Sequence, residues 1–216
     1  MVTRADNSRM IFEAVLFDCD GVLVDSEAIT CGVLRDMLEE KGWSMSVTQC
    51  MEHFVGHTGT PLTDAFMDEF YRRRNVRLET EITLIDGALE AVQYWHAQCQ
   101  GRIAVASGAD RYKIEMMLQR VGLSSYFEGR IFSGHETPRS KPFPDVYLAA
   151  AAHLQVDPAR CLVVEDTPIG VTAGVAAGAT VWGYAPANSI PDTLHAAGAV
   201  QVFEHMHQLR LNSSGV

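Results

Sequence analysis

Short apolar runs alternate with longer segments of helical periodicity along most of the chain. The runs are apolar nearly throughout rather than at every second position, which indicates strands of a sheet that is covered on both faces. Strands that alternate with helices predict a parallel sheet with right-handed crossovers. The expected strands are Glu13–Phe17, Arg102–Ala106, Arg130–Phe132, Cys161–Val164, Ala179–Trp182 and Ala199–Phe203. The clearest expected helices are Ala88–Ala97, Tyr112–Val121, Asp145–Leu154 and Ile169–Ala177.

One stretch, residues 27–86, interrupts this alternation because it has no convincing strand. Its helix-like segments predict an all-helical insert after the first strand. We therefore expect an α/β fold, with a Rossmann-like parallel-sheet core formed by residues 1–26 and 87–216. The insert also carries the run Arg72-Arg73-Arg74, for which a solvated helix end is favoured over a phosphate clamp. The expected helices of the insert are Ile29–Lys41, Val47–Phe54 and Pro61–Arg74.

The composition narrows the class of protein. Of 216 residues, 17 are Lys or Arg and 27 are Asp or Glu, which gives a net charge of −10. Such an acidic chain lacks the electrostatic footprint for nucleic acid or an anionic membrane surface, so neither is an expected partner. No apolar run approaches the roughly 20 residues that span a bilayer, and residues 1–9 do not read as a secretory leader. The five cysteines form no CxxC motif, and they favour a reducing, cytoplasmic location.

Polar residues follow three of the expected strands at the point where each strand ends. In an open α/β sheet, ligands bind outside the carboxyl ends of the strands, so we expect these residues to meet in one crevice. Four of them are carboxylates, whose mutual repulsion a hard divalent cation would relieve, and an all-oxygen ligand set favours Mg²⁺. The residues in question are Asp18, Asp20, Ser107, Gly108, Glu165 and Asp166.

The same residues suit the chemistry of a phosphate ester. A Mg²⁺ ion commonly binds one or two carboxylates plus a substrate phosphate. Lys141 is a candidate cation for the other side of the phosphate, and the Ser107 hydroxyl and backbone N–H groups near Gly108 can donate to its oxygens. Of the pair Asp18 and Asp20, one carboxylate can attack phosphorus while the other protonates the leaving oxygen. Their spacing does not decide which of Asp18 and Asp20 attacks.

Four segments resemble the sequence motifs of the haloacid dehalogenase-like (HAD) phosphohydrolases, in the family's order. They cover the chain from about Phe12 to Phe203, and the helical insert resembles the cap of the β-phosphoglucomutase and phosphoglycolate phosphatase-like branch. The segments are Phe17-Asp18-Cys19-Asp20-Gly21-Val22-Leu23-Val24-Asp25-Ser26-Glu27, Ser107-Gly108, Ser140-Lys141-Pro142 and Val163-Val164-Glu165-Asp166.

The resemblance implies a role for each of these residues. Asp18 would be the nucleophile and Asp20 the acid and base. Asp18, the Asp20 carbonyl and Asp166 would hold Mg²⁺, with Glu165 assisting directly or through water. Ser107 and Lys141 would hold the phosphate of a small phosphorylated metabolite. The expected activity is a Mg²⁺-dependent phosphatase that works through an aspartyl-phosphate.

Two alternatives stay open beside the phosphatase, and the sequence does not address the oligomeric state. A sugar phosphomutase of the same branch would carry an arginine in the loop around Gly56, His57 and Thr58, which in that branch faces the active site and sets specificity. It would also carry a histidine early in the first cap helix, but the matching positions here are Gly59 and Thr30. A non-catalytic protein that binds a phosphorylated ligand is disfavoured, because a binder has no need of both aspartates and a metal.

Overall fold

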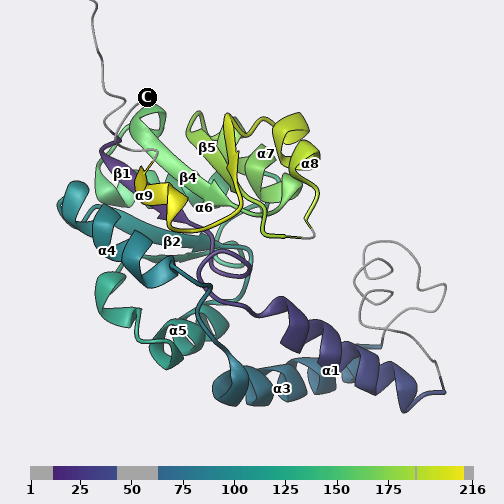
Figure 1. The fold of residues 1–216 in the computed structure, drawn as a ribbon. Coiled ribbons are helices and arrows are strands. Elements are labelled where there is room, and N and C mark those ends of the chain that lie inside the picture. Colours follow the sequence, from purple (N-terminus) through teal and green to yellow (C-terminus); the bar gives the residue numbers. More distant parts are fainter. Residues whose placement is uncertain (1–11, 43–62, 188, 212–216) are drawn as a thin grey trace, which may run out of the picture.

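The computed structural model describes residues 12–42, 63–187 and 189–211, and its centre is a six-stranded parallel sheet (Figure 1). The strand order is β3-β2-β1-β4-β5-β6, so the first strand lies in the middle and the chain fills the sheet outward on both sides. The predicted α/β fold with a Rossmann-like sheet is therefore confirmed. The strands are β1 Ala14–Phe17, β2 Ile103–Ser107, β3 Ile131–Ser133, β4 Cys161–Glu165, β5 Thr180–Tyr184 and β6 Gln201–Phe203.

Burial of both faces explains why the strands are apolar throughout. In β1, Val15 and Phe17 join one hydrophobic cluster while Ala14 and Leu16 join another on the opposite face, as the twofold repeat of a strand requires. Helices α4, α5 and α9 cover the first face and α6, α7 and α8 the second. These helices are α4 Ala88–Gln98, α5 Arg111–Arg120, α6 Asp145–Leu154, α7 Pro168–Ala176, α8 Pro191–Ala197 and α9 Gln208–Leu211, and two 3₁₀ turns lie at Ser124–Tyr126 and Pro158–Arg160.

Two further helices, α1 (Glu27–Glu39) and α3 (Asp64–Glu81), lie to one side of the sheet (Figure 1). They pack on each other through a small apolar cluster of their own, made of Val33, Leu34, Met37 and Phe70. The α3 helix continues seven residues past the predicted end at Arg74, because residues 75–81 contain neither glycine nor proline. The expected helix Val47–Phe54 lies outside the described residues.

The chain leaves the sheet region and returns to it along two adjacent segments. Val24 forms an antiparallel bridge with Leu84. The backbone N–H of Asp25 donates to the Thr83 carbonyl and that of Ile85 to the Leu23 carbonyl, each at 3.0 Å. The segment between these two crossings holds α1 and α3. Among the helices of the described part of the chain, none is both long enough and apolar enough to span a bilayer.

Candidate active site

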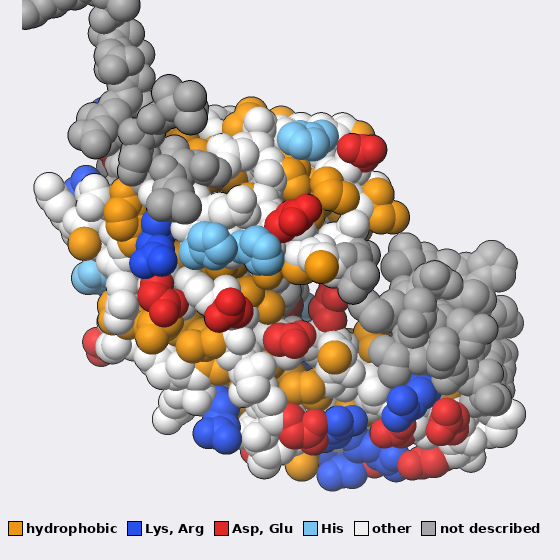
Figure 2. Space-filling model, viewed as in Figure 1, with side chains coloured by type: hydrophobic (Ala, Val, Ile, Leu, Met, Phe, Trp, Pro, Cys, Tyr) orange, Lys and Arg blue, Asp and Glu red, His pale blue; other side chains and the backbone are white. Residues whose placement is uncertain are grey.

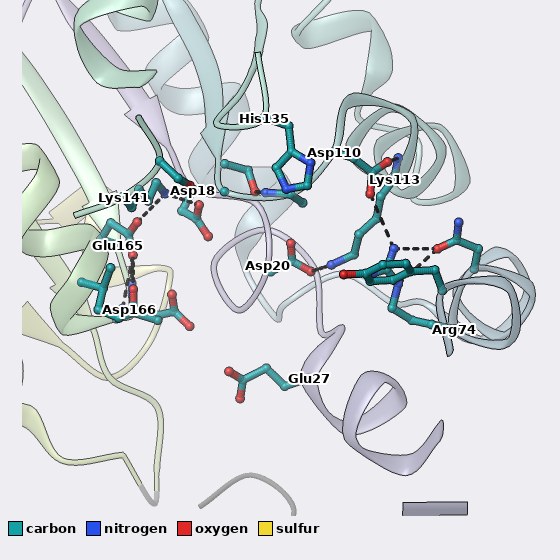
Figure 3. Close-up of a pocket in the computed structure, with 18 residues that line it drawn as sticks. Asp18, Asp20, Glu27, Arg74, Asp110, Lys113, His135, Lys141, Glu165 and Asp166 are labelled. Carbon is teal, nitrogen blue, oxygen red and sulfur yellow. Dashed lines mark hydrogen bonds and ion pairs between the residues drawn. The ribbon is translucent and has the colours of Figure 1, made fainter. Parts of the chain in front are cut away.

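The central strands end side by side, and their registers bring the polar residues that follow them together. Phe17 of β1 pairs with Val105 of β2 and with Val164 of β4, and the Asp18 N–H donates to the Val164 carbonyl at 3.0 Å. A cavity of about 700 Å³ opens at these strand ends, and α3 forms its opposite wall (Figure 3). All six predicted strand-end residues line this cavity, and so does Lys141: Asp18, Asp20, Ser107, Gly108, Lys141, Glu165 and Asp166.

Lys141 is the cation at the centre of the carboxylates. Its Nζ lies 2.6 Å from Asp18 Oδ1 and 2.6 Å from Glu165 Oε1, and its side chain is 9% exposed. Burial by itself lowers the pKa of Lys141, but the carboxylates of Asp18 and Glu165 outweigh burial, so that this pKa lies well above its ordinary value. Lys141 is therefore a fixed positive charge between two carboxylates.

Glu165 uses both of its oxygens to hold the site together. Its Oε1 accepts from Lys141 and from the Tyr147 hydroxyl at 2.7 Å, while its Oε2 accepts from the backbone N–H groups of Asp166 at 3.0 Å and Thr167 at 3.2 Å. Burial would raise the pKa of Glu165, yet the charge of Lys141 dominates and the pKa is lowered. Glu165 is thus an ionised anchor for the lysine and for the turn between β4 and α7.

Asp18 and Asp166 are the two carboxyl groups of the site whose ionised forms are disfavoured by burial. Burial, opposed by Lys141, raises the pKa of Asp18 to about 7. Burial and the neighbouring carboxylates of Glu165 and Asp18 raise the pKa of Asp166 well above its ordinary value. The Asp166 Oδ1 atom is buried and has no hydrogen-bond partner among the described residues. An orphaned buried carboxylate oxygen is costly unless a cation or a proton meets it.

The three carboxylates are arranged so that they fit a metal ion. One oxygen from each of Asp18, Glu165 and Asp166 lies within 4.8 Å of the others. All of these donors are oxygens, which is the ligand set of hard divalent cations. The orphaned Asp166 oxygen belongs to this group. The cluster can therefore hold a metal ion.

Two glycines leave room for these carboxylates. Gly21 has a φ of +75°, and a Cβ there would overlap the Asp166 carboxylate. Gly170, in the first turn of α7, lies against the Glu165 carboxylate, which a Cβ would also overlap. The sequence showed glycines 170, 174 and 178 only as a repeat of small residues. The first of them makes space for a side chain of the site.

Gly170→Ala is expected to destabilise the protein by about 1–3 kcal/mol through overpacking. Alanine is otherwise the better helix former by about 1 kcal/mol, so a loss of stability would come from the collision with Glu165. The free energy of unfolding in urea would measure the effect. Gly108→Ala is the control, because no atom of the described residues lies within 4 Å of a Cβ built there. A Gly170→Ala protein more stable than the wild type would contradict the expectation.

Asp20 is held by two donors that the sequence did not single out. Its Oδ1 accepts from the Ser26 hydroxyl and from Lys113 Nζ, the latter at 2.6 Å. Lys113 lies in the first turn of α5 and its side chain is 8% exposed. A positive charge in the first turn of a helix is unfavourable because it opposes the helix dipole. This unfavourable position was the one sign in the sequence that Lys113 pairs with a carboxylate outside its own helix.

The position of Arg74 also differs from the sequence-based prediction. The solvated position expected for the run holds for Arg72, whose side chain is 63% exposed, but Arg74 is 7% exposed and lines the cavity. Successive helical residues point about 100° apart, so the three arginines span about 200° of the helix surface. Because α3 packs on α1 at one side and lines the cavity at another, one of the three, Arg74, falls on a covered side. Tyr71, Asn75 and His135 also line the cavity.

The remaining predicted residues are placed as follows. The Ser107 hydroxyl accepts from the Ala109 N–H at 3.1 Å, and Ser107 and Gly108 both line the cavity. The Lys141–Pro142 peptide bond is cis. Residues Gly56, His57 and Thr58 lie outside the described residues.

A Rossmann-like sheet with clustered carboxylates at the ends of its central strands, and a buried lysine between them, defines an α/β enzyme with a site that can hold a metal ion. The haloacid dehalogenase-like hydrolase family matches residues 12–178. The chain belongs to this family.

Known relatives agree with that assignment along nearly the whole chain. The chain is 28% identical to the 6-phosphogluconate phosphatase of Escherichia coli, over 91% of this chain and 92% of that one. Its structure matches that of a haloacid dehalogenase-like protein of unknown function from Agrobacterium tumefaciens, at 34% identity and a TM-score of 0.82, over 94% of this chain and 98% of the other. A HAD family hydrolase from Deinococcus radiodurans, solved with bound phosphate and sodium, matches at 32% identity and a TM-score of 0.80, over 94% and 95% of the two chains. The expected HAD-like phosphatase is thereby confirmed as to family and enzyme class.

Proposed function

We propose that this protein is a Mg²⁺-dependent phosphatase that hydrolyses a small phosphorylated metabolite, a sugar phosphate or a similar phosphomonoester, through an aspartyl-phosphate on Asp18. The observation that carries this proposal is the buried Lys141 between Asp18 and Glu165, beside the orphaned oxygen of Asp166. The 6-phosphogluconate phosphatase activity of one relative and the phosphate bound to another support it.

The metal would be held by the side chains of Asp18 and Asp166 and by the Asp20 carbonyl. Glu165 would orient this group, since both of its oxygens already accept hydrogen bonds from the protein. When bound, Mg²⁺ supplies the positive charge that offsets the clustered carboxylates and the phosphate dianion. The raised pKa values of Asp18 and Asp166 describe the same clustered charge without that cation.

The side chains of the protein divide the reaction between them. The Asp18 carboxylate attacks phosphorus, and the ester oxygen leaves with a proton from Asp20. Asp20 then takes a proton from water, which attacks the aspartyl-phosphate and releases inorganic phosphate and free Asp18. The Ser107 hydroxyl and the Gly108 N–H would bind the phosphate oxygens, while Lys141 keeps its charge throughout. Ser26 and Lys113 hold the carboxylate of Asp20 in place for both proton transfers.

We further propose the domain division 1–26 with 87–216 for the catalytic core and 27–86 for a helical cap. The paired crossings at Val24 and Leu84 support this division. The separate apolar cluster of α1 and α3 also supports it. The cap would cover the cavity during the reaction and contribute the specificity loop at residues 56–58. None of the described contacts favours the phosphomutase, and its matching position on α1, Thr30, cannot supply an imidazole.

The proposed function is tested by phosphate release from a panel of phosphomonoesters. The panel contains p-nitrophenyl phosphate, phosphoglycolate, nucleoside monophosphates and sugar phosphates, each assayed with Mg²⁺ and with EDTA. Metal-dependent release of phosphate is the expected result. Conversion of a sugar phosphate to an isomer without free phosphate would instead show the mutase, and binding of these compounds without any turnover would show a binding protein.

Asp166→Asn is expected to stabilise the metal-free protein and to abolish its stabilisation by Mg²⁺. Without metal, the variant should be more stable than the wild type by about 1–3 kcal/mol at neutral pH, because the wild type must either hold a buried, uncompensated charge at Asp166 or take up a proton there on folding. With Mg²⁺, the wild type should gain stability and the variant should not, since ligand binding stabilises only the state that binds. Thermal unfolding with Mg²⁺ and with EDTA measures both effects.

The same charges set the pH dependence of the metal-free protein. Folding raises the pKa of Asp18 from 3.8 to about 7, and it raises that of Asp166 in the same direction. A group with a raised folded pKa favours the folded state when protonated, so stability should fall as the pH rises from about 4 to about 7. Asp166→Asn should reduce that slope. A metal-free wild type that gains stability over this range would contradict the assignment.

A further inference from the structure

An arginine lines the side of the cavity opposite the carboxylate cluster. Arg74 comes from the middle of α3, is 7% exposed and lines the cavity. Figure 3 shows Arg74 and Lys113 on one side, Lys141, Glu165 and Asp166 on the other, and Asp20 between the two groups. A phosphate placed at Asp18 would therefore direct the rest of the substrate toward Arg74.

The hydrogen bonds and the ring contact that hold the Arg74 guanidinium come from neutral groups, and one carboxylate lies farther away. Its Nε and Nη2 donate to Asn75 Oδ1 at 3.1 and 2.8 Å, and its Cζ lies 4.9 Å from the centre of the Tyr71 ring. The Asp110 carboxylate is 3.6 Å from Nη2, beyond hydrogen-bonding distance, and 41% exposed. The charge of Arg74 is thus oriented by an amide and an aromatic face, with one weak and solvated counter-charge.

The other arginines of α3 are neutralised in a different way. Arg72 and Arg73 donate to Glu69, and Arg77 donates to Glu81, all at the surface of the helix. In Figure 2, basic and acidic side chains are intermingled over the part of the molecule where α1 and α3 lie. Lys113, the other cation on this side of the cavity, is paired with Asp20. Arg74 is therefore the arginine of α3 that lines the cavity, and its charge is less fully compensated than that of the surface arginines of the same helix.

The single charge and planar shape of the Arg74 guanidinium favour a carboxylate as the substrate group next to it. A planar guanidinium matches a carboxylate in a two-pronged hydrogen bond, and one positive charge balances one negative charge. A second phosphate would bring about two negative charges toward Asp110 and Glu27, which both line the cavity. The Glu27 carboxylate can accept hydrogen bonds from hydroxyl groups along the substrate. A cavity of about 700 Å³ is in the size range of small-molecule sites.

We propose that Arg74 binds a carboxylate at the end of the substrate remote from the phosphate, so that the substrate is the phosphate ester of a polyhydroxy carboxylic acid. This inference rests on the proposed phosphatase function and specifies its substrate class. Asn75 and Tyr71 position the guanidinium, and Glu27 faces the hydroxyl groups between the two anionic ends.

The test compares three esters with one carbon chain. In 6-phosphogluconate, C1 is a carboxylate; in glucitol 6-phosphate it is a neutral CH₂OH group; in glucitol 1,6-bisphosphate it carries a second phosphate. The wild type should hydrolyse the first with a kcat/KM about tenfold or more above the second, the range of one charge-assisted contact. In Arg74→Gln the preference should disappear: kcat/KM for 6-phosphogluconate falls about 10- to 100-fold, and that for glucitol 6-phosphate changes by less than about twofold. Arg72→Gln, on the solvent side of the same helix, is the matched control and should keep the preference.

Three results would overturn the proposal. They are equal kcat/KM values for the carboxylate and the neutral ester in the wild type, an equal loss for both esters in Arg74→Gln, and a preference for the bisphosphate. Failure of the whole phosphatase assignment is a separate observation, because p-nitrophenyl phosphate would then not be hydrolysed either. If no ester is hydrolysed, or if Arg74→Gln does not fold, the affinities of the two esters for the Asp18→Asn protein are compared by calorimetry instead. Tighter binding of 6-phosphogluconate than of glucitol 6-phosphate upholds the proposal, and equal binding overturns it.

Discussion

Replacing Asp18 by asparagine is expected to reduce phosphate release by about 10⁴-fold or more, which is the scale of losing a nucleophile that acts in a concerted catalytic group. The amide is nearly isosteric with the carboxylate, but it cannot form the aspartyl-phosphate. Lys141 would keep its ion pair with Glu165, so the variant should fold. Turnover is measured as released phosphate, and the covalent intermediate as a phosphoryl group on acid-quenched protein by mass spectrometry.

Asp192→Asn is the matched control for that experiment. Asp192 is an exposed carboxylate in the first turn of α8, outside the cavity, and its replacement should leave turnover unchanged. If Asp18→Asn retained turnover within about tenfold of the wild type, Asp18 would not be the nucleophile. The site of phosphorylation would then be sought at Asp20, the other carboxylate of the pair. The two-residue spacing of these aspartates leaves both assignments open, and the labelled peptide distinguishes them.

Lys141→Met is expected to have the largest effect on stability. The substitution removes the cation from Asp18 and Glu165, whose side chains are 9% and 1% exposed. Breaking a buried ion pair by removing one partner costs about 3–5 kcal/mol, because the remaining charge is left uncompensated. Turnover should fall by about 10³-fold, the scale of losing one preorganised electrostatic group. Urea unfolding and phosphate release measure the two losses.

A second substitution separates the structural part of this effect from the chemical part. Glu165→Gln in the Lys141→Met background removes one of the two stranded charges and should recover part of the lost stability, while turnover stays low. Lys41→Met, at an exposed lysine that follows α1, is the control and should change neither property. A loss of less than about 1 kcal/mol in Lys141→Met would mean that Lys141 does not compensate the buried carboxylates.

The sheet could be predicted to within about two residues because its strands are short apolar runs between polar turns. Cys161–Glu165 and Ile131–Ser133 extend by one residue past the predicted ends, where the next side chain is polar but still buried. Thr180–Tyr184 extends two residues past the predicted end. The prediction stopped at Trp182 because Gly183 interrupts the apolar run, but the Gly183 backbone still pairs with Val202. The helices α8 and α9, with seven and four residues, are too short to show a periodic pattern.

The strand-end residues of the site were predictable for a geometric reason. The carboxyl ends of parallel strands meet at one edge of the sheet, so Asp18 and Glu165 had to lie near each other. Lys113, Arg74 and Tyr147 come from helices instead. Which side of a helix faces the cavity depends on how that helix packs, and the sequence of α3 offers three adjacent arginines of which one points inward.

The hydrogen-bonded crossings at Leu23–Asp25 and Thr83–Ile85 have a consequence for how such enzymes diversify. The ends of the intervening segment are adjacent, so a longer or shorter segment can be spliced in at a small cost in chain entropy. Such an exchange leaves β1 and the turn that carries Asp18 and Asp20 undisturbed. The residues between the crossings can therefore be exchanged by recombination while the clustered carboxylates at the strand ends are inherited unchanged.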